Sequence, residues 1–258
     1  MAKKWAAFPH PDKAYAHDAA GLKKGWPRLH KSDCEPLPKD AGVLDAWRLY
    51  HAGAFADAVA AGRKAGGAGI NAAVKAQMIY ANYLEKSEPA KLALLEEAAG
   101  WADTRRREAP KDANAHYLYA YSLGRYSQGI SITKALAQGF GGKIKDALLT
   151  ALKLEPGHAD AHTAFGSYQA EIIDKVGGIV AGMTYGAKKD SALEHYQKAL
   201  KLNPDSAIAR IEYANGLILL VGKTRMADAE KLYQEAAAMK PADAMERLDV
   251  ELARSELE

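Results

Sequence analysis

A glycine-rich stretch in the second half of the chain has residues of the kinds that bind phosphate. In GGIVAGMTYGAK, residues 177–188, four residues separate Gly177 from Gly182, and Thr184 follows. A phosphate-binding loop of this type needs a lysine directly after its second glycine, a strand before it and a helix after it. Met183 holds the lysine position, and the preceding residues AFGSYQAEIIDK are typical of a helix. This stretch is therefore not expected to bind a nucleotide.

A second stretch, GLILLVGKT at residues 216–224, ends in the Gly-Lys-Thr of such a loop. Five residues rather than four separate its glycines, and it lies where one helix is expected to turn into the next. We predict no nucleotide and no other cofactor from either stretch.

Histidines in GHADAH, residues 157–162, suggest a metal site. His158 and His162 are four residues apart and would share one helix face, as zinc ligands do. However, His116 follows an alanine at the equivalent position of an earlier repeat, which favours a packing role over a ligand. We therefore predict no metal site.

The single cysteine, Cys34, has one histidine nearby, His30. A cysteine nucleophile needs a base and a group that orients it, and no such set can be assigned. The sequence thus predicts no catalytic residue and a protein that is not an enzyme.

The elements around these residues are expected to be helices that share a repeated pattern. Three segments end in proline: IKDALLTALKLEP (144–156), ALEHYQKALKLNP (192–204) and AEKLYQEAAAMKP (229–241). An apolar or small residue lies twelve positions before each proline, a bulky residue lies eight before it, and an alanine lies five before it. These three positions share one helix face and predict a buried stripe. The stripe positions are Ile144, Leu148 and Ala151, then Ala192, Tyr196 and Ala199, then Ala229, Tyr233 and Ala236.

A second amphipathic segment follows each of three prolines: ANAHYLYAYSLGRY after Pro110, ADAHTAFGSYQAEI after Pro156 and SAIARIEYANGLILL after Pro204. Helix pairs of this kind resemble the tetratricopeptide repeat (TPR), a helix–turn–helix unit of about 34 residues. The resemblance implies an all-α fold, a right-handed α-solenoid of antiparallel hairpins whose cores form between neighbours. Each segment carries a bulky residue and a small one four positions later: His116 and Ala120, His162 and Gly166, Arg210 and Ala214.

Two of the hairpins are longer than a TPR unit. Pro110 and Pro156 are 46 residues apart and Pro156 and Pro204 are 48 apart, whereas Pro204 and Pro241 are 37 apart. The extra residues, 127–143 and 173–189, lie between the two helices of a hairpin. Insertions at one place per repeat emerge on one side of a solenoid, often the binding side.

Residues 110–240 show a closer resemblance. LGRYSQGI, KALAQGFGGKIKDALLTALKLEPGHADAHTAFGSYQAEI and GGIVAGMTYGA resemble the helical-repeat domain of the regulator-of-microtubule-dynamics family. The alanine-rich composition suggests its bacterial TPR relatives. We expect residues 1–40 to be irregular with a short helix and 41–258 to form the repeat domain, capped by a polar C-terminal helix.

In a TPR hairpin the first helix, which is here the segment after each proline, lines a concave groove. Its inward positions lie one and five residues beyond the bulky residue. Aromatic, amide and charged side chains at such positions suit the capture of a peptide or protein. We therefore predict a scaffold or adaptor that binds a protein or peptide through this groove and the two insertions. The alternative is an accessory protein that holds a small ligand between the extended hairpins. The predicted groove residues are Tyr117, Tyr121, Arg125, Thr163, Ser167, Glu171, Ile211, Glu212 and Asn215.

Composition narrows the possible partners. The 258 residues carry a net charge of +3 with both signs interspersed, which gives no indication of nucleic-acid binding. The longest apolar run, residues 217–221, is too short to span a bilayer. The N-terminal residues lack the apolar core of a signal peptide. A cytoplasmic protein is therefore expected.

Overall fold

The computed structural model describes residues 5–258. Within that range the regular structure is helical and contains no strand, which confirms the predicted all-α class. The chain forms two compact units. Unit 1 comprises the described residues up to His30, with Glu35–Phe140 and Ala242–Met245, and unit 2 comprises Lys31–Cys34, Gly141–Pro241 and Glu246–Glu258.

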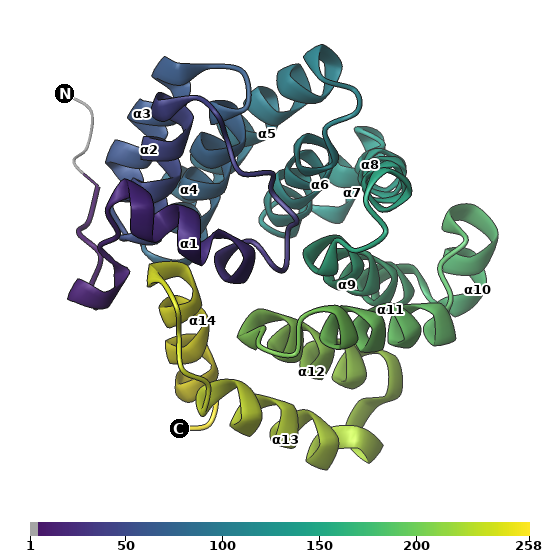
Figure 1. The fold of residues 1–258 in the computed structure, drawn as a ribbon. Coiled ribbons are helices and arrows are strands. Elements are labelled where there is room, and N and C mark those ends of the chain that lie inside the picture. The colour runs from purple at the N-terminus through teal and green to yellow at the C-terminus, as the bar shows by residue number, and fades with distance from the viewer. Residues whose placement is uncertain (1–4) are drawn as a thin grey trace. The chain divides into compact units, whose positions relative to one another are not determined.

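Unit 1 is built from helices of the first half of the chain (Figure 1). Helices α2, α3 and α4 pack against one another, and α4, α5 and α6 do the same. Aspartates at three helix starts, Asp18, Asp40 and Asp112, accept hydrogen bonds from backbone N–H groups of the first turn, which fixes where those helices begin. The elements are η1 (Lys13–Tyr15), α1 (Ala19–Leu29), α2 (Ala41–His51), α3 (Phe55–Ala65), α4 (Gly69–Tyr83), α5 (Glu88–Glu108), α6 (Ala113–Gln128) and α7 (Ile132–Ala137).

The turn between α2 and α3 requires glycine. Gly53 has φ +80°, a left-handed conformation that favours glycine. A Cβ atom there would also lie 2.7 Å from the ring of Phe8. The N-terminal segment therefore packs directly on this turn.

Unit 2 contains the helices of the second half. Helix α9 packs against α11 and α12, and α12 packs against α13. Eight of the nine stripe residues are buried, which confirms the predicted register, and Tyr233 is half-buried. The elements are α8 (Phe140–Leu154), α9 (Ala159–Val176), α10 (Gly178–Val180), the π-helical turn η2 (Ala181–Tyr185), α11 (Lys189–Leu202), α12 (Ala207–Val221), η3 (Gly222–Arg225), α13 (Met226–Ala237) and α14 (Ala244–Ser255).

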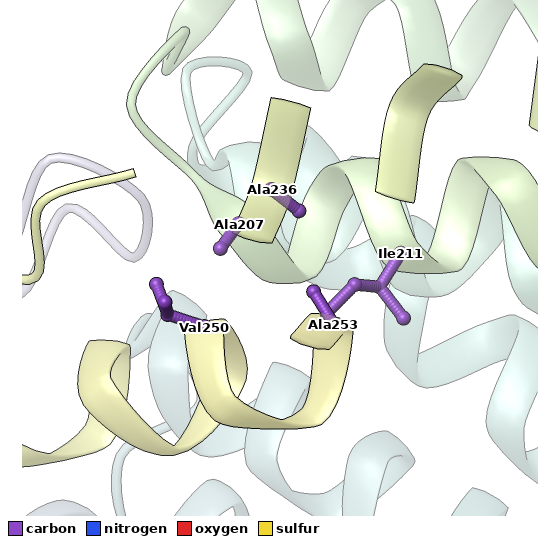
Figure 2. Close-up of a cluster of buried hydrophobic side chains, with 5 residues drawn as sticks. All are labelled: Ala207, Ile211, Ala236, Val250 and Ala253. Carbon is purple, nitrogen blue, oxygen red and sulfur yellow. The ribbon is translucent and has the colours of Figure 1, made fainter. Parts of the chain in front are cut away.

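The C-terminal helix covers an apolar face. Val250 and Ala253 of α14 meet Ala207 and Ile211 of α12 and Ala236 of α13 in one buried cluster (Figure 2). Neighbouring helices thus bury a face that neither could bury alone.

Both units include a segment from a distant part of the sequence. In unit 1, buried Asp243 lies 2.6 Å from Nδ1 of His51, whose Nε2 lies 3.1 Å from Nε2 of His30. In unit 2, Asn203 donates a hydrogen bond to Ser32 Oγ at 2.6 Å, and the Asp160 N–H donates to the Ser32 carbonyl at 3.0 Å. Periodicity gave no sign of these contacts.

Candidate functional site

The residue at the bulky position of the first helix makes the same contact in three consecutive repeats. His116 Nε2 lies 3.1 Å from the carbonyl oxygen of Pro110, and His162 Nε2 lies 3.2 Å from that of Pro156. Arg210 Nη1 donates to the carbonyl of Pro204 at 2.7 Å. A basic side chain six residues after the proline therefore binds the turn between hairpins. This agrees with the packing role predicted for the histidines.

The residues considered for metal binding already make contacts within unit 2. His158 caps α9, because its Nδ1 accepts a hydrogen bond from the Ala161 N–H at 3.1 Å. His162 Nδ1 lies 2.8 Å from Nδ1 of His195. Burial lowers the pKa of His162 and, more strongly, that of His195, to about 4. No group of three or more His, Cys, Asp or Glu suited to a metal ion occurs among residues 5–258.

The glycine-rich stretch is an insertion between helices and not a strand-to-helix loop. Helix α9 precedes it, and Gly177, with φ +79°, ends that helix. The second stretch runs from α12 through η3 into α13. Both observations agree with the structural interpretation made from the sequence.

The environment of Cys34 disfavours its reactive form. Burial raises the pKa of the thiol to about 11, and the carboxylates of Glu155, Asp33 and Asp160 act in the same direction. The thiol is therefore protonated at neutral pH and a poor nucleophile.

In unit 1, the predicted groove residues form an aromatic and polar cluster with one residue that the sequence did not indicate. Asn82 of α4 donates a hydrogen bond to the Tyr121 hydroxyl of α6 at 3.1 Å. Tyr117 stacks on Tyr121 with ring centroids 5.9 Å apart, and the Arg125 guanidinium carbon lies 5.5 Å from the centre of the Tyr121 ring. Two consecutive first helices thus hold Tyr121 in one orientation.

In unit 2, hydrogen bonds also join predicted groove residues of neighbouring helices. Ser167 of α9 donates to Glu212 of α12 at 2.8 Å and accepts from the Tyr196 hydroxyl at 3.0 Å. On α12, Asn215 is exposed and accepts a hydrogen bond from the Tyr233 hydroxyl at 2.7 Å.

Near the end of α9, Glu171 faces Lys175, with Nζ and Oε2 3.4 Å apart. Lys175 is exposed and Glu171 half-buried, so this ion pair lies at the edge of the surface.

Exposure separates the two kinds of predicted inward position. The residues one position beyond the bulky side chain, Tyr117, Thr163 and Ile211, are buried. Those five positions beyond it, Tyr121, Ser167 and Asn215, are half-buried or exposed. The first set therefore packs between helices, whereas the second set is accessible to solvent.

Three polar partners of the predicted groove residues were missed for identifiable reasons. Asn82 lies upstream of the three aligned repeats, so their register did not extend to it. Tyr196 and Tyr233 occupy stripe positions, where the pattern predicted core residues and gave no sign that their hydroxyl groups reach the first helices.

Both insertions carry exposed apolar side chains. In α7, Ile132 and Leu136 are about half exposed and share one helix face. In the second insertion, Ile179 is 81% and Met183 85% exposed. Throughout residues 5–258, no helix has the length and apolar character needed to cross a membrane.

Helical hairpins joined at prolines, with first helices that carry aromatic and polar side chains, define a TPR-like helical-repeat scaffold. The fold is similar to that of TTC0263, a thermophilic TPR protein in Thermus thermophilus, with a TM-score of 0.57 and 16% sequence identity. The match covers 83% of this chain and 97% of that chain. This confirms the predicted TPR-like α-solenoid class.

A comparison of the sequence with protein-family models shows the family of the chain. The family model described as regulator of microtubule dynamics protein 1-3 matches residues 71–256. The chain belongs to this family, and the match extends beyond residues 110–240, where the resemblance was expected. No curated protein matches the sequence.

Proposed function

We propose that the chain is a non-enzymatic scaffold that binds a protein or peptide through the exposed polar and aromatic residues of its first helices. The observation that carries the proposal is the orientation of Tyr121 by Asn82 and Arg125. A half-buried aromatic ring held by two helices offers contact area at little cost in conformational entropy, and its polar neighbours give hydrogen bonds with defined direction.

The corresponding surface of unit 2 supports the same function. Asn215 is exposed, and its orientation is set by Tyr233. Amide side chains in such positions can bind the backbone of an extended peptide, because they offer both a donor and an acceptor. The proposal rests on each surface by itself.

The small-ligand alternative receives less support. The large apolar side chains of the second insertion, Ile179 and Met183, are exposed and not enclosed. Small-molecule sites bury most of the ligand among such residues.

The test compares partner capture by wild type, Tyr121→Ala and Asn215→Ala, followed by mass spectrometry. Trp101→Ala and Gln197→Ala are matched controls, since these residues lie on the second helices α5 and α11. Trp101 carries an Arg63 guanidinium 4.5 Å from its ring, so it repeats the aromatic–arginine pairing of Tyr121.

We expect to find partners that bind wild type and both controls but not Tyr121→Ala or Asn215→Ala. If neither groove variant changes the capture of any partner, the proposed function is wrong.

A further inference from the structure

The second insertion reverses the usual placement of apolar residues. Ala181 and Ala187 are buried, whereas Ile179, Val180 and Met183 are exposed. In a folded domain the larger apolar side chains normally go inside, because they bury more surface. Here the alanines fill the interior of the insertion and its large side chains face solvent.

Contacts at its base hold the insertion in this orientation. A Cβ atom on Gly141 at the start of α8 would lie 2.7 Å from the ring of Tyr185, so the ring packs directly on that backbone. Gly177 and Gly186 bracket the helical turns with φ values of +79° and +66°. Ile179 and Met183 are four residues apart in consecutive helical turns, which places them on one side.

The first charged residues on either side of these side chains are lysines. Residues 176–187 carry no charged side chain, and Lys175 precedes them while Lys188 and Lys189 follow. Lys175 pairs with Glu171 at 3.4 Å, whereas Lys188 and Lys189 are exposed, and Asp174 and Asp190 come next in the sequence. An uncharged segment with large apolar side chains is thus flanked on both sides by lysine.

We propose that residues 177–187 dock on the surface of an anionic lipid bilayer. Ile179, Val180 and Met183 would enter the boundary between headgroups and acyl chains, where protruding apolar side chains need no preformed pocket. Lys188 and Lys189 would extend to the lipid phosphates, since their long apolar stems let the ammonium groups stay at the interface. This interaction goes beyond the proposed protein-binding function and uses a different surface.

The charge pattern favours a bilayer over a protein partner. A protein that covered Ile179 and Met183 would have to supply a complementary apolar pocket, and no feature of the insertion defines such a shape. An anionic bilayer matches both the apolar residues and the flanking lysines without that requirement.

Flotation with lipid vesicles tests the proposal. Wild type should bind vesicles of phosphatidylcholine with about 30 mol% phosphatidylserine at low ionic strength, and bind pure phosphatidylcholine much more weakly. Ile179→Ser/Met183→Ser should reduce the partition coefficient at least about tenfold, because two apolar side chains lose their burial in the bilayer. Both side chains are more than four-fifths exposed, so the fold should be retained.

Met226→Ser/Leu257→Ser is the matched control. Both residues are exposed apolar side chains of unit 2 outside the insertion, and this variant should bind like wild type. Partition equal to wild type in Ile179→Ser/Met183→Ser, or no binding by wild type, would overturn the proposal. In either case loss of a protein partner by the same variant would assign the insertion to a protein surface instead.

A fluorescent label gives a second readout. Met183→Cys can be labelled with an environment-sensitive fluorophore, since the raised pKa of Cys34, about 11, leaves that thiol unreactive near neutral pH. Emission should shift to shorter wavelength on addition of the anionic vesicles, whereas the same label at Lys240→Cys should not respond. An unchanged spectrum at position 183 in samples that float would show that the insertion is not the part in contact with lipid.

Discussion

Replacing Gly216 with alanine should destabilise unit 2, although the same change usually stabilises a helix. Gly216 lies within α12, and a Cβ atom there would lie 2.5 to 2.7 Å from three atoms of the Tyr196 side chain. Tyr196 is fully buried and donates a hydrogen bond to Ser167. The ring therefore cannot move without disturbing packing or this bond.

The expected magnitude follows from three contributions. Overpacking of a buried site costs about 1–3 kcal/mol, and loss of the Tyr196 hydrogen bond costs about 1 kcal/mol. Alanine returns about 1 kcal/mol through its higher helix propensity. The net loss of stability should be about 1–3 kcal/mol.

The assay is urea denaturation followed by circular dichroism. Gly100→Ala is the matched control, because Gly100 is exposed within α5 and a Cβ atom there would have no neighbour within 4 Å. The midpoint should fall for Gly216→Ala and rise slightly for Gly100→Ala.

A midpoint that rises equally in both variants would refute the reasoning. So would strict additivity with Tyr196→Leu, because two residues in steric contact must show coupling in a double-mutant cycle.

Three further predictions concern histidines and their partners. The lowered pKa of His195 means that the unfolded chain binds a proton more readily than the folded chain, so the stability that His195 contributes is present above pH 6.5 and lost as the pH falls towards 4. Urea titrations at pH 7 and pH 5 should therefore show a smaller loss of stability between the two pH values for His195→Asn than for wild type. An equal loss would contradict this. Asp243→Ala should lower the free energy of unfolding by about 2–4 kcal/mol, because it leaves buried His51 without its carboxylate partner. Asp243→Asn should lower it less in the same denaturation assay. Equal losses would argue against the His51–Asp243 hydrogen bond. His116→Leu should cost about 1 kcal/mol by removing the donor to the carbonyl of Pro110, and a thermal scan that shows no decrease would rule out that role.

The helices could be predicted because their pattern is local. The stripe ending in Pro204 placed Ala192, Tyr196 and Ala199 on one face, and the structure buries all three. Helical periodicity reports which face is covered whatever covers it. The same logic located both insertions, since each interrupts the spacing between prolines.

The contacts that join distant segments could not be predicted in this way. Asp243 and His51 are 192 residues apart, and each is a single polar residue in an otherwise ordinary segment. Glu35 is also buried, and its carboxylate accepts a hydrogen bond from Asn114 at 2.7 Å. A pattern within one helix holds no information on such partners.

The exposure of the predicted groove residues could not be predicted for a related reason. Register predicts which residues of a first helix share one face, but not how deeply the next helix covers them. Thr163 and Ile211 are buried whereas Asn215 is exposed, and that difference depends on the neighbouring helices.

The way the chain shares its segments between the two units has a consequence for synthesis on the ribosome. Unit 1 includes Ala242–Met245, and Asp243 supplies the carboxylate beside buried His51. Domains generally fold in order as the chain emerges, but this unit lacks one of its parts until residues 242–245 have been made. A nascent chain stalled before Ala242 should therefore hold an incomplete first unit that is open to proteases, and its release should coincide with protection of the N-terminal half.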